Sequence, residues 1–141
     1  MDTNLQKIEA FIDEHHVLSL ATAVGDEVSA CSLFYAYDKK EQCFIVASSE
    51  DTEHIQNIHK NPKVAANILL ETKEVGKVQG LQVKGKLKEV REQSQKLLYL
   101  KAFPYAVALA PKLWKIEVHS FKLTDNRLGF GKKLTWQVPS L

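Results

Sequence analysis

The stretch from Ser48 to Pro62, SSEDTEHIQNIHKNP, contains the side chains of this sequence that are best suited to bind a charged ligand. Hydroxyl groups occur at Ser48, Ser49 and Thr52, directly before a helical pattern, and His54 falls in the first turn of that helix. The N–H groups at a helix start are free and carry a partial positive charge, which favours anions. The pattern is therefore typical of a turn that binds a phosphate or a carboxylate.

An ordinary capped surface helix is the competing interpretation. Ser49 or Asp51 could cap a helix over residues 52–60. Asn61-Pro62 would end it, because the residue before a proline resists helical geometry. Three acidic residues add negative charge where an anion would bind: Glu50, Asp51 and Glu53. The sequence alone favours the capped helix over the anion site.

The rest of the chain reads as helices at a few junctions between closely spaced strands. The apolar residues of 3–15 fall on one helical stripe. Residues 91–103 read as a second helix, which ends before Pro104. Strand-like runs with short, turn-rich connections cover residues 17–23, 28–37, 43–48, 63–71, 78–90, 113–124 and about 132–136.

Consecutive strands that are linked as hairpins form a mostly antiparallel sheet, and such a sheet curls into a barrel. The sequence therefore predicts a mainly β fold, with a barrel of six to seven antiparallel strands and a few helices. We expect one domain over residues 1–141, with the N-terminal helix at 3–15, the barrel at 17–90 and 112–137, and the helix at 91–103.

Residues 28–37 and 43–48 are predicted to form one hairpin that turns near Lys39-Lys40. In the expected register Ser32 lies opposite Ala47, which would place the first strand beside the start of the helix at 52–60. This register would bring the backbone around Ser32 close to the hydroxyl-rich turn.

The two cysteines, Cys31 and Cys43, would lie about 17 Å apart in this hairpin, which is too far for a disulfide. Two unpaired thiols suit a reducing compartment. The sequence contains no long apolar run, and its first residues carry acids rather than the pattern of a signal peptide. We therefore expect a cytoplasmic protein that does not cross a membrane.

The charge distribution argues against a nucleic-acid-binding protein, and the histidine spacing argues against a zinc site. The formal net charge is +2 and the lysines are scattered, which argues against a nucleic-acid-binding surface. His54 and His59 are five residues apart, about 140° around a helix, so they cannot bind one zinc ion together. The sequence predicts no metal site.

Four segments carry a resemblance to a known family. They are Thr52-Glu53-His54, Asn61-Pro62, residues 80–85 (GLQVKG) and residues 124–133 (TDNRLGFGKK). Together they resemble the YhbP-like bacterial family, a branch of the FMN-binding split barrels related to pyridoxamine 5′-phosphate oxidase. The resemblance covers the chain from about Val17 to Trp136. It implies that the barrel is of the split type.

The resemblance also implies a homodimer with two FMN sites at the subunit interface. The FMN phosphate would be held at the helix start by Ser48, Ser49, Thr52 and His54. The isoalloxazine ring would lie along Ser32, Leu33 and Phe34. The partner chain would contribute Lys132, Lys133 and Trp136. No side chain stands out as a catalytic acid or base, so the flavin would supply the chemistry of an oxidoreductase acting on a small molecule.

Two alternatives remain open. The acidic helix start and the absence of arginine and lysine from residues 28–37 favour a non-catalytic ligand-binding or interaction protein that has lost the flavin. A haem-binding barrel is the other alternative, and His119 would be its axial ligand. A histidine that is simply part of a strand is the more usual explanation of His119.

Overall fold

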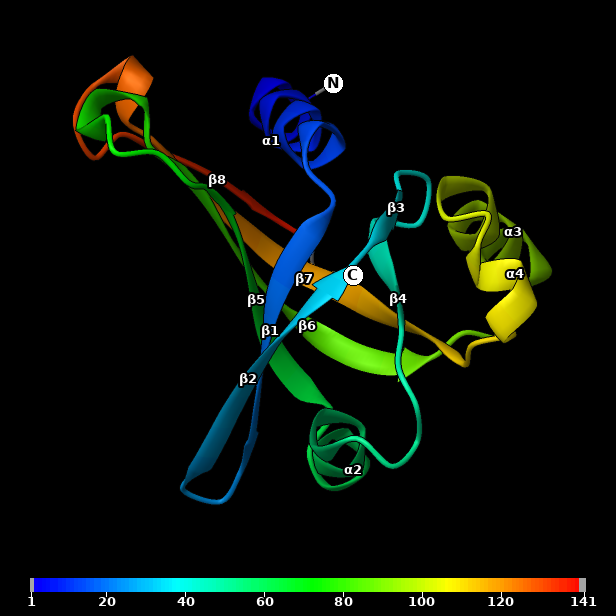
Figure 1. Cartoon of the computed structure of the whole chain (residues 1–141). Helices are drawn as coiled ribbons and strands as arrows, with labels where there is room; N and C mark the ends of the chain where they lie inside the picture. The colour runs from blue at the N-terminus through cyan, green and yellow to red at the C-terminus, as the bar shows by residue number, and fades with distance from the viewer. Residues whose placement is uncertain (1, 140–141) are drawn as a thin grey trace.

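A single curled antiparallel sheet of eight strands forms most of the molecule (Figure 1). The computed structural model describes residues 2–139. The strands are β1 (Val17–Val24), β2 (Glu27–Phe34), β3 (Ala36–Asp38), β4 (Cys43–Ala47), β5 (Lys63–Leu70), β6 (Gln79–Glu89), β7 (Leu113–Asp125) and β8 (Lys133–Gln137). The helices are α1 (Thr3–Glu14), α2 (Glu53–Lys60), α3 (Gln93–Ala102) and α4 (Ala106–Leu109), with short 3-10 turns η1 (Val75–Lys77) and η2 (Asn126–Leu128).

The strand order is β2-β1-β5-β6-β7-β4-β3, and β8 also pairs with β7. The 13 residues of β7 make this possible, because β4 pairs with its first half and β8 with its second half. The two ends of the path, β2 and β3, are not paired with each other. The predicted mainly β, antiparallel split barrel is confirmed.

The predicted hairpin of 28–37 with 43–48 is confirmed only at its turn, where residues 36–38 pair with 43–45; the pairing predicted for residues 28–34 is wrong. The run breaks at Tyr35, so that β2 pairs with β1 and the short β3 pairs with β4. Ser32 consequently lies opposite Ser19 and not opposite Ala47. The break has a clear cause: the Tyr35 amide donates to the carbonyl of His16 at 3.0 Å, and the buried Tyr35 hydroxyl donates to the carbonyl of Ile12 at 2.7 Å.

The barrel interior holds the main core, and the helices cover its openings. Helices α1 and α2 lie at opposite ends of the curled sheet, while α3 and α4 lie beside β3 and β4 (Figure 1). The largest fully buried side chains are aromatic, namely Trp114, Phe44 and Phe121. A second, smaller cluster under α3 and α4 includes Cys43 and Tyr99. Among residues 2–139, both cysteines are free and no helix is long and apolar enough to span a membrane.

Helix α2 is fixed to the sheet by amide and hydroxyl groups as well as by apolar contacts. The Asn57 side chain donates to the hydroxyls of Thr22 and Ser29, each at 3.1 Å. The Asn61 side chain donates to the carbonyl of Ala23 at 3.0 Å. Ile55 and Ile58 of the same helix are buried. The C-terminal half of α2 is therefore held in a defined position against β1 and β2.

Candidate functional site

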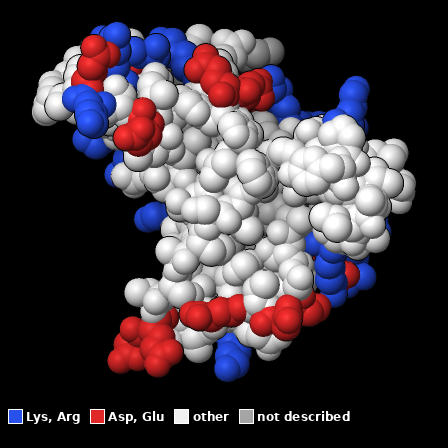
Figure 2. Space-filling view, viewed as in Figure 1, with Lys and Arg blue, Asp and Glu red and all other residues white. Residues whose placement is uncertain are grey.

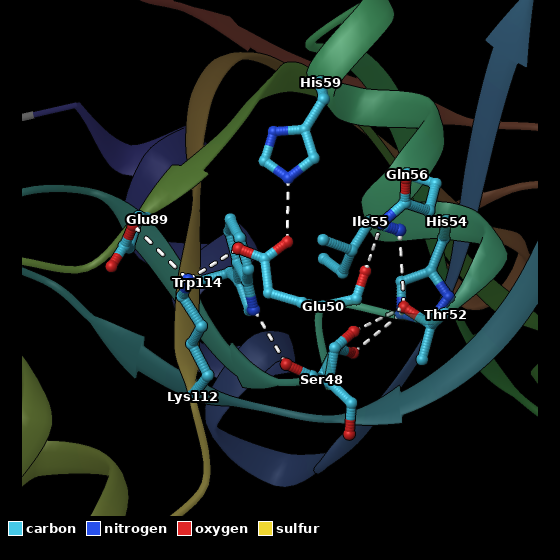
Figure 3. A network of polar contacts seen from close by, with 11 residues as sticks. Ser48, Glu50, Thr52, His54, Ile55, Gln56, His59, Glu89, Lys112 and Trp114 are labelled. Carbon is cyan, nitrogen blue, oxygen red and sulfur yellow. Dashed lines mark hydrogen bonds and ion pairs between the residues drawn. The ribbon is translucent and has the colours of Figure 1, made fainter.

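The hydroxyl-rich turn brings three of the predicted ligand-binding side chains together at the start of α2 (Figure 3). The Ser48 hydroxyl lies 2.7 Å from Nε2 of His54, and the Thr52 hydroxyl lies 3.4 Å from the same nitrogen. All three side chains are partly buried. Ser49, in contrast, is exposed and contributes its carbonyl, which accepts from the Thr52 hydroxyl at 2.9 Å.

Thr52 is the residue that caps α2, so the prediction of Ser49 or Asp51 as the cap is wrong. The Thr52 backbone is extended, and its side-chain oxygen accepts from the amide of Ile55 at 3.4 Å. The helix therefore begins at Glu53, one residue later than predicted. Asn61 ends it as predicted, donating its amide to the carbonyl of Asn57.

The electrostatics of this turn favour hydrogen bonding over full charge pairing. Burial lowers the pKa of His54 below its ordinary value of 6.5, so the imidazole is neutral at pH 7. The amides of Glu53 and His54 lie in the first helical turn, where the helix itself provides no acceptor. The turn can thus offer hydroxyl, imidazole and amide donors to an anion, but no permanent positive charge.

The negative charge of Glu50 affects this turn less than the sequence indicates. Its carboxylate accepts from Nζ of Lys112 at 2.6 Å and from Nε2 of His59 at 2.9 Å (Figure 3). These hydrogen bonds lower the pKa of Glu50, and Lys112 offsets its charge. Asp51 and Glu53 remain exposed beside the helix start. The negative charge near the turn is reduced rather than removed.

Trp114 holds the turn to the sheet, a role that the sequence does not reveal. Its side chain is 2% exposed, and its indole Nε1 donates to the carbonyl of Ser48 at 2.9 Å. The Ser48 amide donates in turn to the carbonyl of Lys112 at 3.1 Å. These contacts follow from the pairing of β4 with β7, which places Ala47 opposite Leu113. No local pattern links positions so far apart in the chain.

The three residues predicted to follow the isoalloxazine ring do not share one face. Leu33 packs against the core, whereas Ser32 and Phe34 point to the outer face of β2. Phe34 is 47% exposed and stacks on the ring of His16, with 5.8 Å between ring centroids. Only Ser32 and Phe34 are therefore placed to meet a ligand on that outer face.

The predicted ligand-binding residues near the end of the chain do not lie close to α2 of the same chain. Lys133 and Trp136 belong to β8, and Lys132 directly precedes it. Figure 1 shows β8 and its preceding turn near α1, whereas α2 lies at the other end of the sheet. Trp136 packs on Phe121, with 5.7 Å between ring centroids. Their predicted contact with a ligand would require a second chain.

The TDNRLGFGKK segment, residues 124–133, builds a turn from its own polar groups. Asp125 is 3% exposed and accepts from the Arg127 side chain at 2.9 and 3.0 Å. The Asn126 side chain accepts from the amide of Gly131 at 3.0 Å. Gly129 and Gly131 have positive φ angles, which glycine adopts without strain. The motif thus shapes the link between β7 and β8.

No group of three or more His, Cys, Asp or Glu side chains within residues 2–139 is arranged to hold a metal ion. His119 is exposed on β7, and its backbone carbonyl accepts from the amide of Val138 at 2.9 Å.

Comparison with known proteins agrees with this fold. Residues 5–122 match the family model described as pyridoxamine 5′-phosphate oxidase. A UPF0306 protein of Photorhabdus laumondii is 33% identical over 137 residues, covering 95% of this chain and 96% of its own. A haem-binding protein from Mycobacterium smegmatis is similar in structure, with a TM-score of 0.80 and 14% identity over 97% of this chain and 59% of that one.

A FAD-binding protein from Mesorhizobium loti is also similar in structure, with a TM-score of 0.70 and 15% identity. The similarity covers 84% of this chain and 90% of that protein. At these identities the two structural matches speak for the fold alone. The family match and the UPF0306 relative go further, and the chain belongs to the pyridoxamine 5′-phosphate oxidase family of split barrels, within its UPF0306 branch.

Proposed function

We propose that this protein binds FMN through the phosphate, at the start of α2, and acts as a flavin-dependent oxidoreductase on a small molecule. The convergence of the Ser48 and Thr52 hydroxyls on His54, at 2.7 and 3.4 Å, is the observation that carries the proposal. When bound, a flavin supplies hydride or electron transfer. The chain itself would bind and orient the flavin.

The donor set fits a phosphate monoester by hydrogen bonding more than by charge. The hydroxyls and first-turn amides suit phosphate oxygens, while His54 is neutral at pH 7 and two exposed carboxylates remain nearby. The family description and the FAD-binding structural neighbour support a flavin. We therefore expect FMN to bind weakly unless another chain adds positive charge.

The free thiols of Cys31 and Cys43 support a cytoplasmic location.

A homodimer would supply that second chain. Six residues on the outer face of β1, β2 and β5 form an uncharged strip: Val17, Ser19, Ser32, Phe34, Asn67 and Leu69. Figure 2 shows that the middle of this view is largely free of charged side chains, which lie mainly around its rim. Exposed apolar side chains on a flat face favour association. In the proposed dimer the partner's β8 segment brings its lysines and tryptophan to the flavin.

The dimer is tested by the mass in solution. Light scattering at micromolar concentration should give twice the 15.9 kDa of one chain. Phe34→Glu buries a charge in the proposed interface and should reduce the mass to that of one chain, because an unpaired buried charge is costly. Val75→Glu is the control, since Val75 is 57% exposed on η1 and lies outside the strip. A single-chain mass for the unaltered protein would contradict the dimer.

FMN binding is tested by the absorption and fluorescence of added flavin. His54→Ala should weaken FMN uptake about tenfold, on the order of 1.4 kcal/mol, by removing a donor at the phosphate. His54→Lys should strengthen it by a similar factor, because it adds a full charge at the same position. Thr72→Ala, in the loop after β5, is the control. Uptake that is equal in the two His54 variants would refute the proposed phosphate position.

The same spectra separate the two alternatives. The exposed imidazole of His119 and the haem-binding structural neighbour favour haem as the second candidate. A Soret band that disappears in His119→Ala would support it. A folded, colourless protein that takes up neither FMN nor haem would support a non-catalytic binding or interaction protein.

A further inference from the structure

A pocket of about 490 Å³ lies on the outer face of the sheet near the C-terminal end of α2. Its floor consists of small apolar side chains from three strands: Ala21, Ala23, Val28 and Ala65. Lys63, Lys84 and His119 also line it. None of the residues proposed to bind the flavin phosphate belongs to this pocket, and the uncharged strip occupies the other half of β1, β2 and β5.

The lysines of this face repel one another. Lys63 of β5 lies directly opposite Lys86 of β6, and Lys84 points to the same face two residues earlier. Like charges directly opposite each other destabilise a sheet. Among residues 2–139, none of these three lysines has an ion-pair partner. Glu117, which lies opposite Lys86, pairs instead with Lys88 at 2.8 Å.

A β-bulge adds His119 to the same pocket. Lys84 pairs with Ser120 and Gly85 with Val118, so His119 is the extra residue of β7. The bulge shifts the alternation of buried and exposed side chains along β7, so that the next buried side chain after Val118 is that of Phe121. His119 is therefore exposed beside Lys84. Three strands thus contribute one positively charged or protonatable side chain each.

We propose that this pocket binds a small organic anion with a flat apolar body and a phosphate or carboxylate group. The apolar floor would contact the body of the ligand. Lys63 and Lys84 would bind its acidic group, and His119 would donate a further hydrogen bond. Binding would also relieve the repulsion between Lys63 and Lys86. This site is separate from the proposed flavin site and does not depend on it.

Three matched probes test the proposal by isothermal titration calorimetry: 1-naphthyl phosphate, 1-naphthoate and the uncharged 1-naphthol. We expect saturable binding of at least one of the two anions, at least tenfold tighter than that of 1-naphthol. The preferred anion identifies the acidic group. The double variant Lys63→Gln/Lys84→Gln should weaken binding of that anion at least tenfold. Lys73→Gln/Lys101→Gln, which alters two exposed lysines outside the pocket, should leave it unchanged.

Three results would overturn the proposal: no saturable binding of either anion, equal binding of 1-naphthol, or equal affinity in the two double variants. Thermal unfolding of each variant checks that it is folded. FMN uptake by Lys63→Gln/Lys84→Gln should be unchanged. If FMN displaces the bound anion, the pocket is part of a flavin site and is not a second site.

Discussion

Gly85→Ala should lower the free energy of unfolding by about 2–4 kcal/mol, although it adds a single methyl group. A Cβ atom at this position would lie 2.2 Å from the carbonyl oxygen of Glu117 and 3.2 Å from a methyl carbon of Ile116. The oxygen belongs to the backbone of the paired strand β7, so it cannot move aside as a flexible side chain could. The change would force β6 and β7 apart at the bulge, in the middle of the sheet.

Gly80→Ala is the matched control, because Gly80 also lies in β6. A Cβ atom there would meet only the end of the Leu69 side chain, at 3.8 Å. Its effect should stay within about 0.5 kcal/mol. Urea unfolding followed by tryptophan fluorescence measures both variants. Similar losses in the two would mean that β6 requires glycine for backbone freedom and not for the close approach of β7.

Trp114→Ala should lower the free energy of unfolding by about 3–5 kcal/mol, the usual cost of removing a large aromatic side chain from a core. The indole is 2% exposed and also fixes the turn before α2 through its bond to the carbonyl of Ser48. Because this turn holds the proposed phosphate site, FMN uptake should fall as well. Chemical unfolding and flavin titration on the same samples measure the two effects.

Trp114→Phe separates packing from hydrogen bonding. It keeps an aromatic ring but leaves the Ser48 carbonyl without its donor, which costs about 1–3 kcal/mol. Tyr105→Phe is the control, since Tyr105 is 62% exposed and is not among the residues proposed to bind the flavin. If Trp114→Phe binds FMN as tightly as the unaltered protein, the indole bond does not position the turn.

Local patterns predict the elements of this protein well and its pairings less well. The end of α2 at Asn61 and the long strand β6 follow from nearby residues. The break at Tyr35 does not, because its cause is the carbonyl of His16, on a segment that pairs with β2 only in the folded chain. Because the sequence does not reveal this break, the partner strand of β2 and the residue opposite Ser32 are both predicted incorrectly.

The candidate site likewise contains groups that nearby sequence predicts and groups that it does not. Ser48 and His54 are only six residues apart, and the short turn between β4 and α2 brings their side chains together. Trp114 and Lys112 approach the turn from more than 60 residues away, and only the pairing of β4 with β7 reveals them. Sequence reasoning therefore finds the candidate ligand-binding groups that lie within one turn. It misses the groups that hold that turn in place.

The strand β7 pairs with β6 along both of its halves, whereas on its other edge the first half pairs with β4 and the second half with β8, on either side of the bulge around His119. Its first half supports the turn at α2 through Trp114, and its second half supports β8. A change at the β4 or β8 edge would therefore act on one half of β7, while the ladder with β6 continues across both halves. This arrangement would let related split barrels diverge in what they bind while a single shared strand preserves the framework.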